Sequence, residues 1–277
     1  MSTFVVTGSS TGIGEACTLR LAGAGHRVIA GVRRVEDGER LAAQHGSIVP
    51  VLLDVTDQTQ IDALVGRLDE LGIRQLDGLV DNAGIVVGGP LEYLDLDDWR
   101  NQFEVNVLGQ IAVTKALIPA LRSGRGRVVF IGSISGRVST SLVGPYCASK
   151  HAIEAIAEAL REELRPWKLA VSVVEPGAVK TPIWDKGRAF ADELEARMPD
   201  EAHELYADAI DEIRGQIDAQ ERSGVAADRV AAVVERALTS RWPRYRYLVG
   251  ADAKAAGLLE RFLPDRAMAF VARRLGP

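Results

Sequence analysis

Short apolar runs alternate with longer stretches of helical period along most of this 277-residue chain. The runs are rich in β-branched residues and are bounded by Gly, Pro or charged residues, as buried strands of a parallel sheet are. This alternation is typical of repeated βαβ units, so we expect a doubly wound, seven-stranded α/β sheet of Rossmann type. The predicted strands cover residues 3–7, 27–32, 48–52, 77–81, 126–132, 169–175 and 245–249.

Apolar residues recur at spacings of three and four between these runs, which predicts helices there. The predicted helices cover residues 13–24, 35–45, 58–71, 97–121, 146–165 and 226–239. We expect one domain over residues 1–277, since α/β folds of about 250 residues commonly form a single unit. It divides into a coenzyme-binding and catalytic core at 1–182, a helical substrate lid at 183–223 and a C-terminal extension at 251–277.

Composition narrows the classes of partner. A net charge of −5 offers no basic surface for nucleic acid. No apolar run reaches the roughly 18 residues of a membrane-spanning helix, and no export signal is visible, so a cytoplasmic protein without integral membrane association is expected. The four histidines lack ligand spacing, so no metal site is expected.

A glycine-rich turn follows the first predicted strand, with Gly8, Gly12 and Gly14 in the spacing G-x-x-x-G-x-G. Glycine permits a close backbone approach, and the free N–H groups of the helix that begins here favour a bound phosphate. A mere tight turn is the alternative. The residues predicted to contact the coenzyme in this turn are Gly8, Ser10, Thr11, Gly12, Ile13 and Gly14.

Tyr146 and Lys150 are four residues apart at the start of a predicted helix and therefore share one face. A nearby ammonium would lower the pKa of a tyrosine and make it a useful proton carrier. Ser133 follows a predicted strand, where open α/β sheets place ligand-binding groups, and its hydroxyl can hold a reacting oxygen. Ser135 competes for that role, and a turn serine or a solvated Tyr–Lys pair are the structural alternatives.

These motifs together resemble the short-chain dehydrogenase/reductase family from the first strand to about residue 182. Ser133, thirteen residues before Tyr146, matches the family's catalytic serine, and Asn106 matches its catalytic asparagine. Asp81 replaces the first residue of the family's Asn-Asn-Ala-Gly element. The further coenzyme contacts implied by the resemblance are Asp54, Val55, Asn82, Ala83, Gly84, Tyr146, Lys150, Pro176, Gly177 and Thr181.

The resemblance implies hydride transfer between a nicotinamide and a carbonyl or alcohol, with Tyr146 moving the proton. Ser133 would hydrogen-bond the substrate oxygen, Lys150 would bond the nicotinamide ribose, and Asn106 would hold a relay water. Members of the family that have become coenzyme sensors typically lose the tyrosine or lysine, and both are present here. A 3-oxoacyl reductase would have a shorter chain and a smaller substrate segment.

NADP(H) is the expected coenzyme. Val32 aligns with the position where NAD-selective members carry an acid, and Arg33 and Arg34 follow it. A guanidinium there can clamp a 2′-phosphate, whereas an exposed basic pair after a strand is the alternative.

Apolar residues recur at helix-like spacing in the acidic stretch 180–223, which predicts a lid over a lipophilic substrate, as in the steroid- and retinol-type members. The alternative is that this stripe only packs on the core. The resemblance also implies a homodimer or homotetramer through the helices that carry Asn106 and Tyr146. The tail after Ala251 is expected to pack on the core, on an oligomer interface or on a membrane surface.

Overall fold

A computed structural model describes residues 1–264, 266 and 267. Its centre is a seven-stranded sheet in the order β3-β2-β1-β4-β5-β6-β9, with every neighbouring pair parallel. The strands are β1 (Thr3–Val6), β2 (Arg27–Val32), β3 (Ile48–Leu52), β4 (Gly78–Asp81), β5 (Arg127–Ile131), β6 (Ala170–Pro176) and β9 (Arg246–Val249). This confirms the predicted fold class, and each predicted strand end is correct to within one residue.

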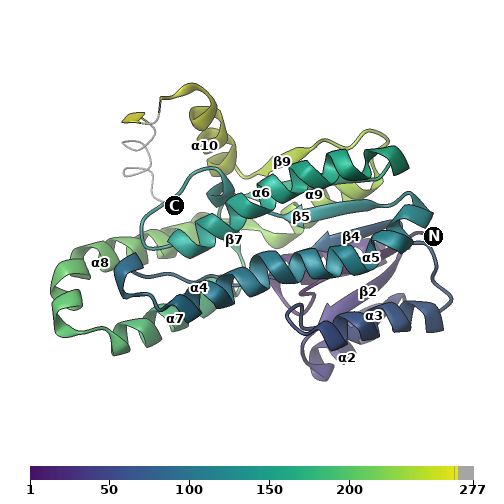
Figure 1. Ribbon diagram of the computed structural model, residues 1–277, viewed down its shortest axis with the longest axis horizontal. Coiled ribbons are helices and arrows are strands. Elements are labelled where there is room, and N and C mark those ends of the chain that lie inside the picture. The colour runs from purple at the N-terminus through teal and green to yellow at the C-terminus, as the bar shows by residue number, and fades with distance from the viewer. Residues whose placement is uncertain (265, 268–277) are drawn as a thin grey trace.

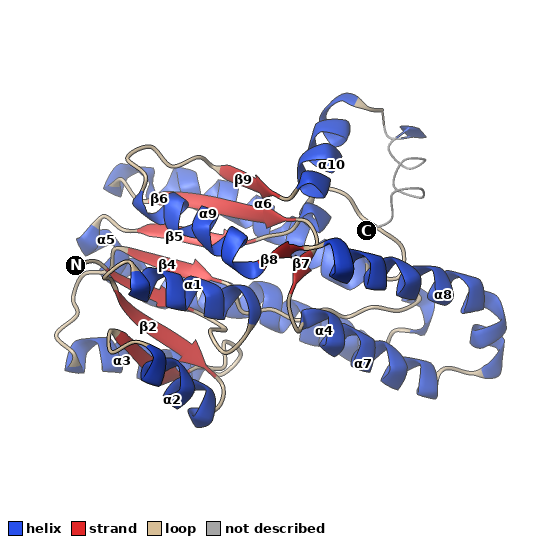
Figure 2. Ribbon diagram, turned by 180° about the vertical axis from the view of Figure 1, so that it is seen from behind, coloured by secondary structure: helices blue, strands red, loops and turns tan. Residues whose placement is uncertain are grey.

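Helices cover both faces of the sheet (Figures 1 and 2). One apolar layer joins the sheet to α1 (Gly12–Gly23), α2 (Val35–Gln44) and α9 (Ala227–Thr239). The opposite layer joins it to α3 (Gln58–Glu70), α5 (Gln110–Gly124) and α6 (Gly144–Leu164). Because both faces are buried, the strands read as continuous apolar runs and not as alternating ones.

The predicted helix at 97–121 is interrupted, which corrects the sequence-based expectation. It consists of α4 (Leu96–Phe103), the π-helical turn η2 (Glu104–Gly109) and α5. Gly109 passes so close to the core that an added Cβ would lie 2.7 Å from Val55 Cγ2. Single π turns inside helices often occur at functional sites, and this one carries Asn106.

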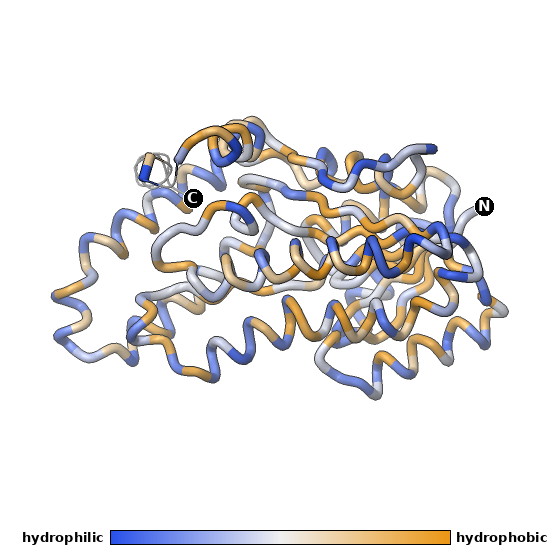
Figure 3. Tube along the Cα trace, turned by 45° about the horizontal axis from the view of Figure 1, so that its top comes forward, coloured by the Kyte–Doolittle hydropathy of each residue, from blue (hydrophilic) through white to orange (hydrophobic). Residues whose placement is uncertain are grey.

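The acidic stretch forms two helices, α7 (Ile183–Arg197) and α8 (Asp200–Ser223), which project beyond the carboxyl ends of the strands (Figures 1 and 2). Hydrophilic residues predominate along α8, and hydrophobic ones gather in the strands (Figure 3). At the base of the projection β7 (Val179–Lys180) pairs in parallel with β8 (Val225–Ala226). These two-residue strands were not predicted, because so short a segment has no readable period.

Helix α10 (Ala251–Phe262) follows β9 directly and begins the predicted C-terminal extension. Residues 265 and 268–277 of that extension lie outside the described residues. Three 3₁₀ turns complete the connections, namely η1 (Leu91–Tyr93), η3 (Ile134–Gly136) and η4 (Arg165–Trp167). None of the helices described here is both long enough and apolar enough to cross a membrane.

Candidate active site

The strand order reverses between β1 and β4, and in open α/β sheets ligands bind at such a switch point. The chain segments that leave these two strands are tied together there. Asn82 Nδ2 donates to the carbonyl oxygens of Thr7 (2.9 Å) and Gly8 (3.1 Å). The Thr7 hydroxyl in turn accepts from the backbone N–H of Asn82 and of Ala83. The predicted coenzyme residues of the two segments are therefore adjacent.

The glycine turn is built for close backbone contact. Gly8 and Gly12 have φ values of 63° and 62°, in the left-handed region that favours glycine. A Cβ at Gly14 would overlap the carbonyl oxygen of Gly8. Thr11 occupies the N-cap position of α1 without a side-chain cap hydrogen bond, which leaves the N–H groups of the first turn open to an anion.

Arg40 of α2 folds back over this turn, a contact that the sequence did not reveal. Its Nη2 donates to the Ser10 carbonyl oxygen at 2.6 Å, and its Nη1 pairs with Glu15. Arg40 therefore places a guanidinium beside the turn. No local motif marks it, because the contact spans 30 residues of chain.

The end of β2 presents the two predicted arginines differently. Both Arg33 and Arg34 are exposed, but Arg34, at the N-cap position of α2, pairs through its Nε with Asp37 at 3.0 Å. Arg33 makes no ion pair or side-chain hydrogen bond within residues 1–264, 266 and 267, so its guanidinium is available to a ligand. Val32 is only 2 % exposed and belongs to the core, which makes it a poor position for an introduced carboxylate.

Asp54 and Val55 follow β3. The Asp54 carboxylate accepts from the Thr56 N–H (3.0 Å) and hydroxyl (2.7 Å), which closes a local turn. Val55 is buried against Gly109 of the π turn. The segment that follows β3 is therefore packed against the segment that carries Asn106.

Ser133, Tyr146 and Lys150 come together at the carboxyl ends of β5 and β6. Ser133 caps η3 and accepts from the Ser135 N–H at 3.1 Å, so Ser135 contributes backbone to the turn. Lys150 is 4 % exposed, and its ammonium donates to the Ile131 carbonyl oxygen at 2.7 Å and lies 5.7 Å from the Tyr146 ring centroid. Tyr146 and Lys150 share one face of α6, as their spacing predicts.

Burial is the main influence on the charge state of this group. Burial raises the pKa of Tyr146 to about 12, and a hydrogen bond with Ser133 opposes that rise. Burial also lowers the pKa of Lys150 to about 8, against the attraction of Glu154. The Lys150 ammonium is directed to the Ile131 carbonyl, and a lowering of the Tyr146 pKa by Lys150 stays a prediction. At neutral pH the phenol is protonated and ready to donate.

Asn106 is fully buried in the π turn. Its Oδ1 accepts from the Ile85 N–H at 2.8 Å, and its Nδ2 donates to the Ile85 carbonyl (3.0 Å) and to Ser149 Oγ (3.2 Å). The carboxamide thus ties the segment after β4 to α6. Gly84 lies against it, since an added Cβ would be 3.3 Å from Asn106 Oδ1.

Asp81, the departure from the family's Asn-Asn-Ala-Gly element, is also fully buried. Its Oδ2 accepts from the Thr114 hydroxyl at 2.5 Å, whereas its Oδ1 has no partner. Burial raises the Asp81 pKa to about 8, so this carboxyl is largely neutral at pH 7. A neutral acid can occupy the place of an amide without introducing a charge beside the coenzyme segment.

Strand β6 ends at Pro176, and Gly177 follows it in the segment that leads to Thr181, which is expected to lie along the nicotinamide. The Ala178 N–H donates to Asp252 of α10 at 2.7 Å, so the C-terminal helix holds this segment in place. Thr181 lies against the glycine turn, because a Cβ on Gly12 would be 3.2 Å from its side chain. An open depression of about 770 Å³ lies beside it; its lining residues are Lys180, Thr181, Pro182, Asp185, Asp218, Glu221 and Arg222.

Part of the apolar stripe of the projecting helices packs on the core. Leu194 and Met198 are buried against Val87 and Leu94, with Phe190 and Ile210 partly buried beside them. Leu205 is 64 % exposed and lies outside this packed group. Ile183, Trp184 and Ile213 are half-buried. No cluster of three potential metal ligands occurs among the residues that the structure describes.

Known proteins resemble the chain over this whole arrangement. The family described as short chain dehydrogenase matches residues 2–192. An NADPH-dependent 3-dehydrocapnine reductase from Ornithobacterium rhinotracheale is 32% identical, covering 95% of this chain and 93% of the relative. Retinol dehydrogenase 5 from Mus musculus is 35% identical over 94% of this chain and 84% of the relative.

Solved structures agree. A short chain dehydrogenase from Burkholderia cenocepacia in complex with NADP has a TM-score of 0.74 at 27% identity and covers 100% of this chain and 98% of its own. A short chain dehydrogenase/reductase from Burkholderia phymatum in complex with NAD has a TM-score of 0.78 at 27% identity, over 94% and 92% of the two chains.

The parallel sheet, the glycine turn and the Ser133–Tyr146–Lys150 group define a Rossmann-type oxidoreductase. The chain belongs to the short-chain dehydrogenase/reductase family, with retinol dehydrogenases and hydroxysteroid dehydrogenases among its relatives.

Proposed function

We propose that the chain is an NADP(H)-dependent oxidoreductase that interconverts an alcohol and a ketone or aldehyde, with Tyr146 as the general acid and base. The observation that carries the proposal is that the Tyr146 phenol and the Ser133 hydroxyl meet at the carboxyl end of the sheet. Two hydroxyl groups can bond one reacting oxygen. Such a pair suits a reaction in which a carbonyl oxygen gains a proton.

The residues present fit a dinucleotide. The uncapped start of α1 and the left-handed Gly8 and Gly12 form a backbone cradle for a pyrophosphate. When bound, the nicotinamide supplies or accepts the hydride. Asn82, Ala83, Gly84, Pro176, Gly177 and Thr181 are the residues proposed to line the remainder of the coenzyme site.

This chain's own groups handle the oxygen and its proton. In reduction the protonated Tyr146 donates to the carbonyl oxygen while Ser133 hydrogen-bonds the same oxygen. In oxidation the tyrosine must first release its proton, which its raised pKa opposes at neutral pH. Lys150 is proposed to bond the coenzyme ribose, and Asn106 is proposed to hold a relay water.

The choice of NADP(H) rests on Arg33. It is exposed and makes no ion pair among the described residues, at the end of the strand next to the glycine turn. A guanidinium can form two parallel hydrogen bonds to a phosphate. Asp54, Val55 and Arg34 are proposed to lie on the adenine side, where Arg34 serves the coenzyme only if it leaves Asp37.

Residues 183–223 are proposed to form the substrate lid on a single domain whose core is 1–182, with an extension from residue 251. The half-buried apolar residues of α7 and α8 that do not pack on the core favour a lipophilic substrate. We also propose a cytoplasmic homodimer or homotetramer.

Turnover tests the proposal. Lipophilic ketones and aldehydes, with short hydroxy acids and sugars as controls, are assayed with NADPH and NADH, and the corresponding alcohols with NADP and NAD. We expect NADPH-dependent reduction of lipophilic carbonyls. Coenzyme binding without turnover of any compound would favour a sensor, and a preference for small polar substrates would contradict the lipophilic assignment.

A further inference from the structure

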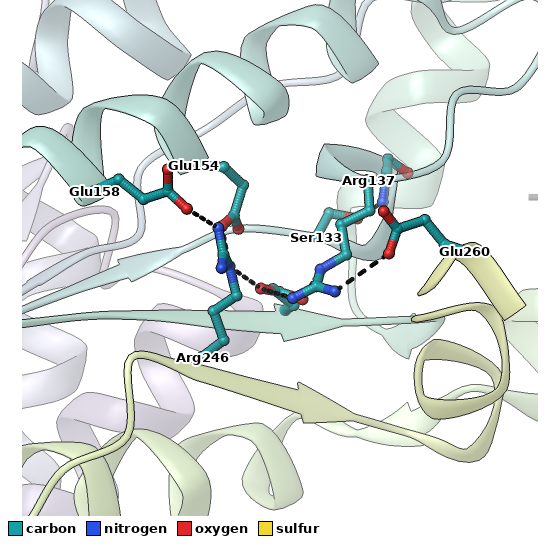
Figure 4. A network of polar contacts seen from close by, with 8 residues as sticks. Ser133, Arg137, Glu154, Glu158, Arg246 and Glu260 are labelled. Atoms are coloured by element: carbon teal, nitrogen blue, oxygen red, sulfur yellow. Dashed lines mark hydrogen bonds and ion pairs between the residues drawn. The ribbon is translucent and has the colours of Figure 1, made fainter. Parts of the chain in front are cut away.

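A group of charged residues lies near Ser133 and takes no part in the proposed chemistry (Figure 4). The group consists of two glutamates and two arginines, namely Arg137, Glu154, Glu175 and Arg246. Glu175 is fully buried in β6, and Glu154 of α6 is 8 % exposed. Arg246 of β9 lies between them, with its Nε 2.8 Å from Glu154 Oε2 and 3.3 Å from Glu175 Oε1.

Arg137 approaches Glu175 from the opposite side. Its Nη2 donates to Glu175 Oε1 at 3.2 Å, and its Nε is 2.7 Å from Oε2. Arg137 is the residue at which the η3 turn ends, four positions after Ser133. The ion pair therefore joins the turn that carries the serine to the strand that leads into Pro176 and Gly177.

Besides Arg137, packing on α6 and backbone hydrogen bonds place this turn. Its own hydrogen bonds, from Gly136 to Ser133 and from Arg137 and Val138 to Ile134, are local and fix its shape only. At its start the Gly132 N–H bonds the Val174 carbonyl at 2.8 Å. Beyond Ser133 the turn packs against α6, where a Cβ at Gly136 would be 3.0 Å from the Lys150 carbonyl oxygen. Arg137 is its charged attachment to β6.

The C-terminal helix contacts the same arginine. Glu260 of α10 lies 3.6 Å from Arg137 Nη1, while Asp252 at the other end of α10 accepts from Ala178. One helix thus contacts both the serine turn and the coenzyme segment.

We propose that Arg137 and Glu175 are positioning residues for the reaction: their ion pair holds Ser133 in register with Tyr146. This inference rests on the proposed function. A buried ion pair is a weak source of stability, because desolvation offsets the attraction, so a role in geometry is the better account of its retention. A small displacement of a group that bonds the reacting oxygen lowers the rate more than it lowers coenzyme binding.

The test compares Arg137→Met with Arg20→Met. Arg20 is a matched control, since it also pairs with two carboxylates of another element, at 2.6 Å to Glu235 and 3.0 Å to Asp228, away from Ser133. We expect Arg137→Met to lower kcat about 10- to 100-fold with the coenzyme Kd unchanged. Arg20→Met should lower Tm and leave kcat as it is. Hydrogen exchange at residues 132–138 should accelerate only in Arg137→Met.

The double variant Arg137→Met/Glu175→Gln separates position from stability. In Arg137→Met the buried Glu175 carboxylate keeps only Arg246 as a cationic partner, which costs stability. Glu175→Gln removes that negative charge, so Tm should recover in the double variant while kcat stays low. It also serves if the single variant does not fold. Recovery of both kcat and Tm in the double variant would make the ion pair merely structural and would overturn the proposal. A kcat and a hydrogen-exchange rate equal to those of the wild type in Arg137→Met would overturn it as well. A wild type inactive on every compound contradicts the proposed function instead, and the exchange experiment still reports on the turn.

Discussion

Tyr146 can carry a proton only if its hydroxyl is free to reach the substrate oxygen beside Ser133. We predict that Tyr146→Phe lowers kcat by about 10²- to 10⁴-fold, the usual contribution of a general acid or base. The ring remains, so the coenzyme Kd measured by fluorescence titration should not change. A rate near that of the wild type would remove Tyr146 from the chemistry, and loss of coenzyme binding would make the ring mainly structural.

Arg33 is the residue that should separate the two coenzymes. Loss of a hydrogen bond to a charged group costs about 1.5–3 kcal/mol, so Arg33→Ala should weaken NADPH binding roughly 10- to 150-fold and spare NADH. Arg34→Ala is the matched control, because Arg34 already pairs with Asp37. Comparison of kcat/KM for both coenzymes checks this, and equal losses for NADPH and NADH would show that no phosphate is bound there.

Asp81 gives the stability of the protein a dependence on pH. Its folded pKa is raised above the ordinary value of 3.8 to about 8, so folding favours the protonated form. The stability that this proton contributes is complete below about pH 4 and is lost as the pH rises through about 8. Asp81→Asn keeps an acceptor for Thr114 and removes the titration.

We therefore predict that Asp81→Asn stabilises the protein by about 1–3 kcal/mol at pH 8.5, the cost of an unsatisfied buried polar group, and much less at pH 5. Urea unfolding at both pH values measures the difference. An equal effect at the two pH values would mean that Asp81 is ionised in the folded protein throughout.

The glycine turn and Ser133 could be proposed from the sequence because they follow predicted strands, where open α/β sheets place ligand-binding groups. Asn106, buried inside the π turn, was proposed only from the resemblance to the family. The contacts of the arginines around the site could not be predicted in this way. Arg34 turns to an acid three residues on, Arg40 reaches back 30 residues, and Arg137 meets Glu175 across 38 residues. Such contacts depend on the packed fold and leave no local pattern.

At the scale of elements, the close packing of the first turn of α1 against the glycine turn requires a residue without a side chain at position 14. We predict that Gly14→Ala abolishes coenzyme binding and lowers Tm, because its Cβ would overlap the Gly8 carbonyl oxygen. Gly23→Ala in the same helix is the control. Nothing lies within 4 Å of its Cβ, so the change should stabilise the helix by about 0.5–1 kcal/mol. Unaltered coenzyme affinity in Gly14→Ala would contradict the cradle.

The strands and most helices could be predicted because a sheet buried on both faces imposes long apolar runs and short polar turns on the sequence. The π turn could not, because the apolar period continues through Glu104–Gly109 while one extra residue is accommodated. The packing of α7 was left open between core and substrate. In the structure some of these apolar residues are buried, as Leu194 and Met198 are, and others are only half-buried, as Trp184 is.

At the scale of the molecule, the surface around the π turn bears on assembly. Leu108 is 50 % exposed there, on the helices proposed to form a shared bundle. Light scattering should give the mass of a dimer or tetramer, and Leu108→Asp should reduce it towards the monomer because a charge would be buried at the interface. Leu205→Asp, on the exposed side of α8, should leave the mass unchanged. A strictly monomeric wild type would contradict the oligomer.

The pairing of β7 with β8 has a consequence for how relatives of this protein can diverge. Val179 and Val225 are register partners, so the 45 residues between them leave the core and return to it at the same place. Lengthening or exchanging a segment with paired ends costs little loop-closure entropy and shifts no strand of the main sheet. If residues 183–223 form the proposed substrate lid, substrate range can therefore change by replacement of this one segment while the groups proposed to transfer the proton keep their positions.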